Sequence, residues 1–385
     1  MKLNSLEGSS VRGCWELKWG FTSKPAETCH QVGDKHKDRF PCQLSFNPSW
    51  RLDFQGFRRT ALWLILLTVG ATILRLLYLT GEGLTADEGF SVFLARTTAA
   101  NFRNILWRGE FNMVLYYVAL RSWMHLGSGE FLVRLLSVLF ATATVPVIYF
   151  LGVRLFKRST ALIACLLLAI HPAHLILSQR ARSYPLVILL VALASLFFLR
   201  LLEEPTWMHG AAYAVLSSAA VYTHFFAVFV IFAQWLSLIF LAPRSLPWKA
   251  LRTSLLLMLA LLVPLGVFLL HAQDGGQVDW VMDLSRQQVL AVLYSLTLSK
   301  GRSLLYIVLW VAAIWCVFKP QPEDRRWSYW FVMTWQFLPP VITVVASVVK
   351  PLLVTRFLAV CIPASVLLAA GGLRNWRAGR DPQRR

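Results

Sequence analysis

The sequence predicts an all-α protein that crosses a membrane many times. Of its 385 residues, 57% are apolar and only 15% are charged, whereas soluble domains carry about 25% charged residues. Apolar runs of about 20 residues, the length that spans a bilayer, recur along the chain, and Lys and Arg fall mostly between them. The net charge of +19 therefore fits membrane orientation and anionic lipid headgroups. Nucleic-acid binding would need a basic face on a soluble fold.

Composition divides the chain into three regions. Residues 1–55 are polar with no sustained period and are predicted to form a flexible cytoplasmic leader, without the pattern of a cleaved signal peptide. Residues 56–373 hold the membrane domain, and 374–385 form a basic cytoplasmic tail. About ten membrane helices are predicted. They are 61–79, 134–155, 160–178, 184–202, 209–222, 225–241, 251–271, 303–318, 328–348 and 356–373.

Basic residues predict the orientation of these helices. Arg58 and Arg59 precede the first span, which places its start in the cytoplasm. The segment 81–133 is too charged to span, and within it residues 88–100 and 113–126 are expected to be interfacial helices in the first outer loop. If both lie flat on the membrane, the later basic loops and both termini are cytoplasmic.

Two adjacent acids, Asp87 and Glu88, follow the first span directly. Charged residues next to lipid are costly, which makes them candidates for a functional site. The alternative is that they only begin a surface helix, because acids favour the first turn. The pair alone does not separate these two interpretations.

Further polar residues converge on the same outer face in this topology. They are Glu110, Gln179, Arg180, Arg182, Tyr184, His224, Lys350, Arg356 and the charged residues of loop 272–302. Arginine offers a fork of donors that suits phosphate oxygens, and a nearby carboxylate can take the proton of an attacking hydroxyl. Simpler roles exist: arginines that snorkel to phospholipid heads, a satisfied interfacial His224, an ion-paired Glu110, and Tyr116 and Tyr117 as aromatic anchors.

Short motifs in this order resemble the GT-C glycosyltransferases that use polyprenyl-phosphate sugars, especially the family-39-like relatives of protein O-mannosyltransferases and lipid A aminoarabinose transferases. The motifs are Asp87-Glu88, Leu115-Tyr116-Tyr117, Glu130-Phe131 with Arg134-Leu135-Leu136-Ser137, Ser178-Gln179 with Ala181-Arg182-Ser183-Tyr184, Tyr222-Thr223-His224-Phe225-Phe226, and Arg356-Phe357. The resemblance implies a GT-C bundle, Asp87 as the base of an inverting displacement, and outer-face cations around the donor phosphate.

One departure concerns Arg180. Relatives usually have Ser-Gln-Glu-Ala-Arg where this chain has Ser178-Gln179-Arg180-Ala181-Arg182, so an acid is replaced by a cation. The replacement implies a different acceptor, compensation by Glu110 or Glu88, or lost activity. Val114 also stands where relatives carry a Pro before the Leu-Tyr-Tyr run.

The sequence therefore predicts a glycosyltransferase of the inner membrane, with its active site on the outer face. It would move a sugar from a polyprenyl-phosphate donor to a hydroxyl of a glycan, lipid or protein. Asp87 and Glu88 are the predicted catalytic carboxylates, with Asp87 as the general base and Glu88 or Glu110 helping to orient the acceptor. Glu110, Tyr116 and Tyr117 are expected to orient the acceptor, and Arg182, Tyr184, His224 and Arg356 to bind the donor phosphate. No metal-ligand pattern is present, although a divalent metal is compatible with the chemistry.

Two other functions are compatible with the sequence. A flippase or transporter of lipid-linked sugars would show paired broken helices and charges near mid-membrane. An inactive relative that only binds lipid phosphate would account for Arg180. With either function, as with the enzyme, the expected partners are a polyprenyl-phosphate lipid and the bilayer, and no nucleic acid.

Overall fold

The computed structural model describes residues 54–77, 79–241, 246–271, 285–297, 303–318 and 323–378. The predicted leader falls outside these residues except for its last two positions, and so does most of loop 272–302. The helices are α1 Phe54–Leu76, α2 Ala86–Arg96, α3 Ala99–Ile105, α4 Val114–Trp123, α5 Glu130–Leu155, α6 Arg158–Ala169, α7 Pro172–Ser178, α8 Tyr184–Glu203, α9 Trp207–Thr223, α10 Ala227–Ser237, α11 Trp248–His271, α12 Arg286–Leu296, α13 Ser303–Val317, α14 Glu323–Ala346 and α15 Ile362–Ala378.

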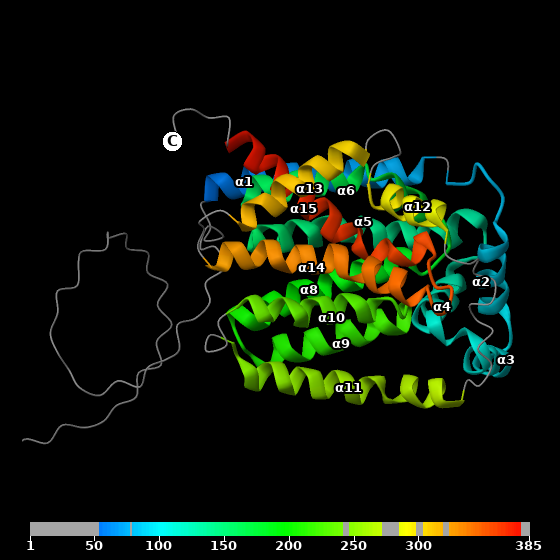
Figure 1. The fold of residues 1–385 in the computed structure, drawn as a ribbon. Helices are drawn as coiled ribbons and strands as arrows, with labels where there is room; N and C mark the ends of the chain where they lie inside the picture. Colours follow the sequence, from blue (N-terminus) through cyan, green and yellow to red (C-terminus); the bar gives the residue numbers. More distant parts are fainter. Residues whose placement is uncertain are drawn as a thin grey trace, which may run out of the picture. The chain divides into compact units, whose positions relative to one another are not determined.

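The long helices lie side by side, and the short helices α2, α3 and α4 gather at one end of them (Figure 1). Helix α8 and the segment Thr355–Arg374 lie at the centre of the bundle, because 83% and 89% of their most apolar 18-residue stretches are buried. Helices α1 and α11 lie at the edge, with only 11% and 22% buried. Exposed leucines and valines on edge helices suit contact with lipid.

The polytopic all-α fold predicted from the sequence is confirmed. Six described helices are long and apolar enough to cross a membrane, and the pair α6 and α7, bent by 57° at residues 170–171, makes a seventh. Shorter apolar helices cover Ala227–Phe240 and Ser303–Trp315, and α9 covers the remaining predicted span. All ten predicted segments are thus helical, while the number that crosses the membrane stays a prediction.

The first outer segment differs from its prediction in one respect. Residues 88–100 were expected to form one helix, but α2 ends at Arg96 and α3 begins at Ala99. The Thr98 side chain accepts a hydrogen bond from the backbone N–H of Asn101 at 3.3 Å, which starts a new helix. The Arg121 guanidinium of α4 donates to the carbonyls of Ala95 and Thr97 at 3.1 and 2.7 Å and so caps the end of α2.

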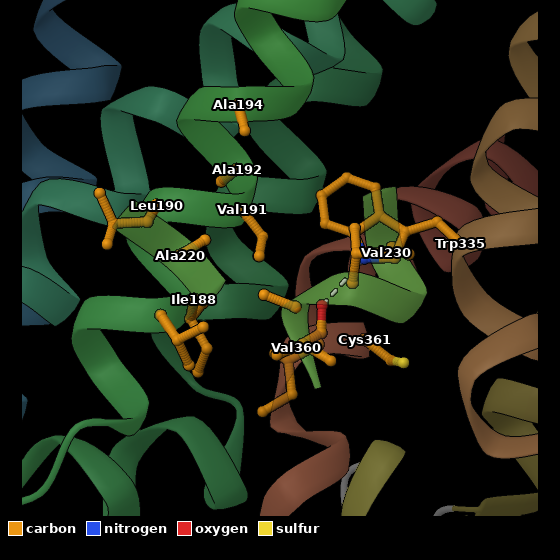
Figure 2. Packing of buried hydrophobic residues seen from close by; sticks show 14 of the residues in the cluster. Ile188, Leu190, Val191, Ala192, Ala194, Ala220, Val230, Trp335, Val360 and Cys361 are labelled. Carbon is orange, nitrogen blue, oxygen red and sulfur yellow. Dashed lines mark hydrogen bonds between the residues drawn. The ribbon is translucent and has the colours of Figure 1, made fainter. Parts of the chain in front are cut away.

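A tightly packed core fixes the segment η8, Thr355–Cys361, which leads into α15. Side chains from α8, α9, α10 and α14 surround it in Figure 2. The Trp335 indole N–H donates to the carbonyl of Val360 at 2.9 Å, and Val360 and Cys361 are fully buried. This core therefore sets the position of Arg356, one turn earlier in the same segment.

Gly372 marks the closest approach between α13 and α15. A Cβ built on Gly372 would overlap the backbone carbonyl of Leu309, whereas one built on Gly70 of α1 meets nothing within 4 Å. We expect Gly372→Ala to lower the stability of the protein by about 1–3 kcal/mol, because backbone atoms must shift. Gly70→Ala should leave it unchanged or slightly higher. Thermal unfolding in detergent measures both, and equal melting temperatures would contradict the tight crossing.

Candidate functional site

Helix α2 begins at the acid pair, and local capping explains why. Thr85 is the N-cap, and the Glu88 carboxylate three residues later accepts hydrogen bonds from the Thr85 backbone N–H at 2.9 Å and from its hydroxyl at 3.0 Å. The simpler interpretation of the acids, as helix starters, therefore holds for Glu88. The same turn leaves Asp87 with 43% of its side chain exposed at the helix start.

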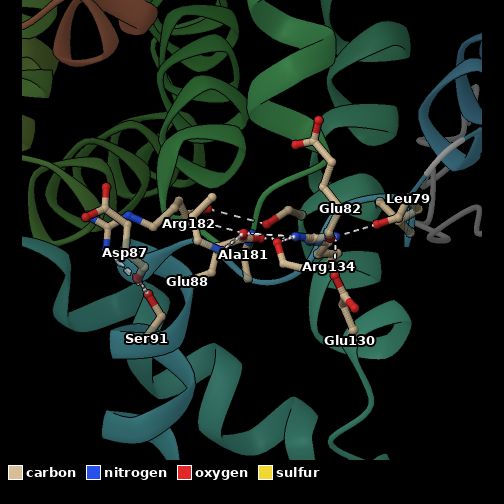
Figure 3. A network of polar contacts seen from close by, with 12 residues as sticks. Leu79, Glu82, Asp87, Glu88, Ser91, Glu130, Arg134, Ala181 and Arg182 are labelled. Carbon is tan, nitrogen blue, oxygen red and sulfur yellow. Dashed lines mark hydrogen bonds and ion pairs between the residues drawn. The ribbon is translucent and has the colours of Figure 1, made fainter.

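Glu88 is the centre of a buried polar network (Figure 3). Its two carboxylate oxygens accept from Nε and Nη2 of Arg134 at 2.8 and 3.0 Å. Arg134 also donates to the carbonyls of Leu79, Glu82 and Gly83 at 2.7, 2.9 and 3.1 Å. Arg134 thus ties α5 both to α2 and to the loop that follows the first membrane helix.

The same carboxylate reaches a second loop. Glu88 Oε1 accepts from the backbone N–H of Ala181 at 2.9 Å, and the Glu88 side chain is fully buried. Burial alone would raise the pKa of Glu88, but the hydrogen bonds from Arg134, Thr85 and Ala181 outweigh it and lower that pKa to about 2. Glu88 is therefore a permanently ionised anchor for the turn that carries Arg182.

Two arginines from distant parts of the chain meet at Asp87. Arg356 Nη1 lies 2.6 Å from Asp87 Oδ2, and the pair is roughly 40% exposed. Arg182 Nη1 donates to the backbone carbonyl of Asp87 at 3.2 Å and to Oγ of Ser91 at 3.4 Å. The three residues singled out from the sequence on separate segments thus lie in one cluster, which we call the Asp87 cluster.

His224 lies against this cluster as a neutral side chain. Its ring is 5.7 Å from the Tyr184 ring and 4.8 Å from the Phe357 ring. Burial, aided by the charges of Arg182 and Arg356, lowers the pKa of His224 to about 3. Because Nδ1 accepts from the Phe226 backbone N–H at 3.3 Å, the proton resides on Nε2, a buried donor without a protein partner among the described residues.

The remaining predicted residues form one wall of the cluster. Tyr117 donates from its hydroxyl to Oε2 of Glu110 at 3.4 Å, and burial raises the pKa of Glu110 despite the opposing charge of Arg182. The Tyr116 hydroxyl lies 3.5 Å from Oγ of Ser137. Both tyrosines are fully buried, so they act here as packing residues whose polar ends face Glu110 and α5.

Several anchoring residues were not among the predicted site residues. Arg134 is the main one. The side-chain carbonyl of Asn112 accepts from the Phe225 N–H at 2.9 Å and ties the first outer segment to the His224 turn. Gln179 donates to the carbonyls of Arg75 and Leu77 at 3.2 and 2.7 Å. The sequence signal for Arg134 is an arginine inside the first turns of an apolar helix, and Gln179 was already among the polar residues expected on the outer face.

Arg180 and the long outer loop are not part of the Asp87 cluster as described. Arg180 is exposed, and its backbone carbonyl accepts from the Arg182 N–H at 2.8 Å in the tight turn. Most of loop 272–302 lies outside the described residues. No group of three His, Cys, Asp or Glu side chains is placed to hold a metal ion in the part of the chain that the structure describes.

An apolar cavity of about 170 Å³ adjoins Arg356. Its walls come from α7, from Leu296 at the end of α12 and from the segment η8. The lining residues are Ala173, Ile176, Leu177, Leu296, Thr355, Arg356, Ala359 and Ile362. A guanidinium at the rim of an apolar cavity is an arrangement that can receive a molecule with an anionic head and a hydrocarbon tail.

Comparison with known structures places this bundle among the GT-C membrane folds. ArnT from Cupriavidus metallidurans superposes with a TM-score of 0.61 at 16% identity, over 82% of this chain and 61% of ArnT. A crystal structure of ArnT bound to undecaprenyl phosphate gives the same TM-score at 15% identity, over 82% and 62%. The oligosaccharyltransferase of Archaeoglobus fulgidus tethered with an acceptor peptide gives 0.53 at 14%, over 85% and 50%.

The sequence itself matches one family. The model of the dolichyl-phosphate-mannose-protein mannosyltransferase family covers residues 113–270, and no curated protein matches the chain. The resemblance predicted from the sequence is therefore confirmed as a likeness of fold, with a sequence match over residues 113–270, and the chain is an integral membrane protein. It spans about three fifths of the length of ArnT and half that of the archaeal enzyme.

The low pKa of Glu88 leads to a prediction about stability and pH. A carboxyl whose folded pKa lies near 2 and whose unfolded pKa is near 4.5 stabilises the fold fully above pH 4.5, and the stabilisation is lost as the pH falls toward 2. We expect Glu88→Gln to lower the stability at pH 7 by about 3 kcal/mol and to flatten its decline between pH 4.5 and 2. Thermal unfolding across that range measures both effects. Asp87→Asn should change stability little, because its ion pair is exposed; equal losses in the two variants would count against the anchoring role of Glu88.

Proposed function

We propose that this chain is a glycosyltransferase that takes a sugar from a polyprenyl-phosphate donor. The observation that carries the proposal is the Asp87 carboxylate held beside Arg356, at the rim of an apolar cavity. The structural relatives add support, because one of them binds undecaprenyl phosphate and another dolichol-phosphate. A lipid phosphate would place its head on the arginines and its first isoprene units in the cavity.

Asp87 is the proposed general base. The acceptor hydroxyl attacks the anomeric carbon, the bond from that carbon to the phosphate oxygen breaks, and the phosphate leaves with the bonding electrons. The hydroxyl proton passes to an oxygen of Asp87 as the new glycosidic bond forms. Attack opposite the leaving phosphate inverts the anomeric centre. The partial exposure of Asp87 leaves room for an acceptor to approach.

Arg182 and Arg356 are the proposed partners of the donor phosphate, and they are held differently. Two hydrogen bonds, to Asp87 O and Ser91 Oγ, fix Arg182. Arg356 instead pairs with Asp87 itself. An arriving phosphate competes with Asp87 for Arg356, so donor binding would release the carboxylate to accept a proton. Both cations then stabilise the charge that develops on the leaving phosphate.

The other predicted site residues take supporting roles in this proposal. Glu88 positions the Arg182 turn instead of exchanging protons. The Nε2–H of neutral His224, beside Tyr184, offers an uncharged donor to the donor phosphate. Glu110, with the hydroxyl of Tyr117, orients the acceptor, and Tyr116 packs behind it.

We also propose the orientation that the sequence implies: both termini in the cytoplasm, residues 1–55 as a leader, 374–385 as a basic tail, and the site at the outer face of the inner membrane. The acceptor is a hydroxyl of a glycan, lipid or protein. In this orientation α2, α3 and α4 lie at the outer interface.

A flippase is the main alternative, and Arg75 is the observation most relevant to it. Arg75 is buried in the last turn of α1, 2.7 Å from Nδ1 of His174. It also donates to the carbonyls of Leu168 and Ala169 at 3.4 and 3.5 Å, at the C-terminal end of α6. A cation that caps a helix end is a structural arrangement. Only one broken helix, α6 with α7, is found among the described helices, whereas a flippase of this kind would have a pair. The binding-only relative, suggested by Arg180, is tested by the assay below.

We expect Asp87→Asn to lower sugar transfer by two to four orders of magnitude, the range for loss of a general base, while lipid-phosphate binding is retained. The assay is transfer from a labelled polyprenyl-phosphate sugar to a membrane glycan extract by the purified protein. Glu82→Gln, an exposed acid of the preceding loop, is the matched control and should keep its activity.

Three results of this assay separate the candidate functions. Transfer that depends on Asp87 supports the enzyme. Movement of the labelled lipid across vesicles without transfer supports the flippase, and binding with neither activity supports the inactive relative. Full activity in Asp87→Asn would remove this residue from the mechanism.

We expect Arg356→Gln and Arg182→Gln each to weaken binding of undecaprenyl phosphate about tenfold or more, because each variant removes a charge-assisted contact. Arg103→Gln, an exposed arginine of α3 at the same end of the bundle, is the control and should bind normally. Titration of the protein in nanodiscs measures the affinity. Unchanged affinity in both variants would show that the lipid phosphate binds elsewhere.

A further inference from the structure

A second and larger cavity, of about 750 Å³, lies between α9 and α11. It is at the end of the bundle opposite the Asp87 cluster, because α8 runs for about 30 Å from Tyr184, beside Arg182, to Glu203, two residues before the lining residue Pro205. In Figure 1, both α9 and α11 begin at the end far from α2 and α4. No step of the proposed reaction uses this cavity.

Three layers of side chains line the cavity along α11. Trp248 and Lys249 stand at the start of the helix, Thr253 and Ser254 follow one turn later, and Leu257 follows one turn after that. Positions 249, 253 and 257 are four apart and so share one face of the helix. The polarity of this face falls from a cation and an indole, through hydroxyls, to an aliphatic side chain.

Helix α9 supplies the opposite wall. Trp207 stands at its first turn with 81% of its surface exposed, and Ala211 lies one turn deeper. A Cβ added to Gly210 would approach the hydroxyl of Ser254 to 2.7 Å, so the two helices touch there and close the inner side of the cavity. Exposed indoles are typical of the membrane–water interface. The mouth of the cavity therefore lies at headgroup depth.

We propose that this cavity binds one anionic phospholipid. The phosphate lies at Lys249 between the two indoles, the glycerol esters lie beside the hydroxyl of Thr253, and an acyl chain runs over Ala211 and Leu257. None of the described residues that line the cavity is acidic, so the charge of Lys249 selects for a negatively charged headgroup. The layers match the order of phosphate, ester and hydrocarbon in a phospholipid.

Trp207 provides a direct probe of this site. Purified protein is placed in phosphatidylcholine vesicles that contain brominated phosphatidylglycerol or, at the same mole fraction, brominated phosphatidylcholine. The fluorescence of Trp207 is taken as the difference between the wild type and Trp207→Phe. We expect brominated phosphatidylglycerol to quench this difference more strongly, and Lys249→Gln to weaken that preference about fivefold.

Arg59→Gln is the matched control, because Arg59 is an exposed cation at the start of α1 that does not line the cavity. It should keep the preference. Equal quenching by the two brominated lipids, no quenching of Trp207 by either, or a preference that survives Lys249→Gln would each overturn the proposal. The measurement does not depend on sugar transfer, so it stands apart from the proposed activity.

Discussion

The buried ion pair of Glu88 and Arg134 is the constraint on which the candidate site depends. A charged carboxylate with no exposed surface is stable only when every oxygen is paired, and here one carboxylate receives donors from Thr85, Arg134 and Ala181. These donors belong to the first outer segment, to α5 and to the α7–α8 turn. These hydrogen bonds offset the cost of burying the Glu88 charge. They also fix three segments of the chain against one another, and this holds Arg182 beside α2.

Neighbouring acids in one helical turn have different environments for the same reason. The capping contact with Thr85 turns Glu88 inward, and successive positions on a helix point about 100° apart, so Asp87 faces outward. One acid is then a fixed anchor, and the other is exposed enough to meet a substrate. The first interpretation of the pair offered two alternatives, a helix start or a catalytic site. The structure assigns the helix start to Glu88 and leaves Asp87 available for the chemistry that we propose.

The sequence predicted the positions of the long apolar helices well, because apolar runs are local features. It also predicted that residues 87, 182, 224 and 356 lie on the same side of the membrane. Basic loops indicate how the helices are oriented, and that orientation assigns each loop to one of the two membrane sides. It did not predict the break at Thr97 and Thr98, which depends on Arg121 from another helix. The role of Arg134 was missed for the same reason: apart from Glu130 on the same helix, its partners Glu88 and Leu79 lie 46 and 55 residues away, and periodicity carries no information on such contacts.

The contact between Asp87 and Arg356 joins residues 269 positions apart, and so joins the first outer segment to the last. Neither residue is fixed by this contact alone: capping by Glu88 holds the first, and the Trp335–Val360 hydrogen bond holds the backbone near the second. An exposed ion pair of this kind contributes about 1 kcal/mol or less. In the proposed function, a phosphate would therefore displace the carboxylate from Arg356 at small cost without loosening the bundle, because the buried contacts of Glu88 and Arg134 stay in place. The exposed pair of Asp87 and Arg356 is thus suited to the exchange of ligands. The buried pair of Glu88 and Arg134 is suited to maintaining the geometry of the site.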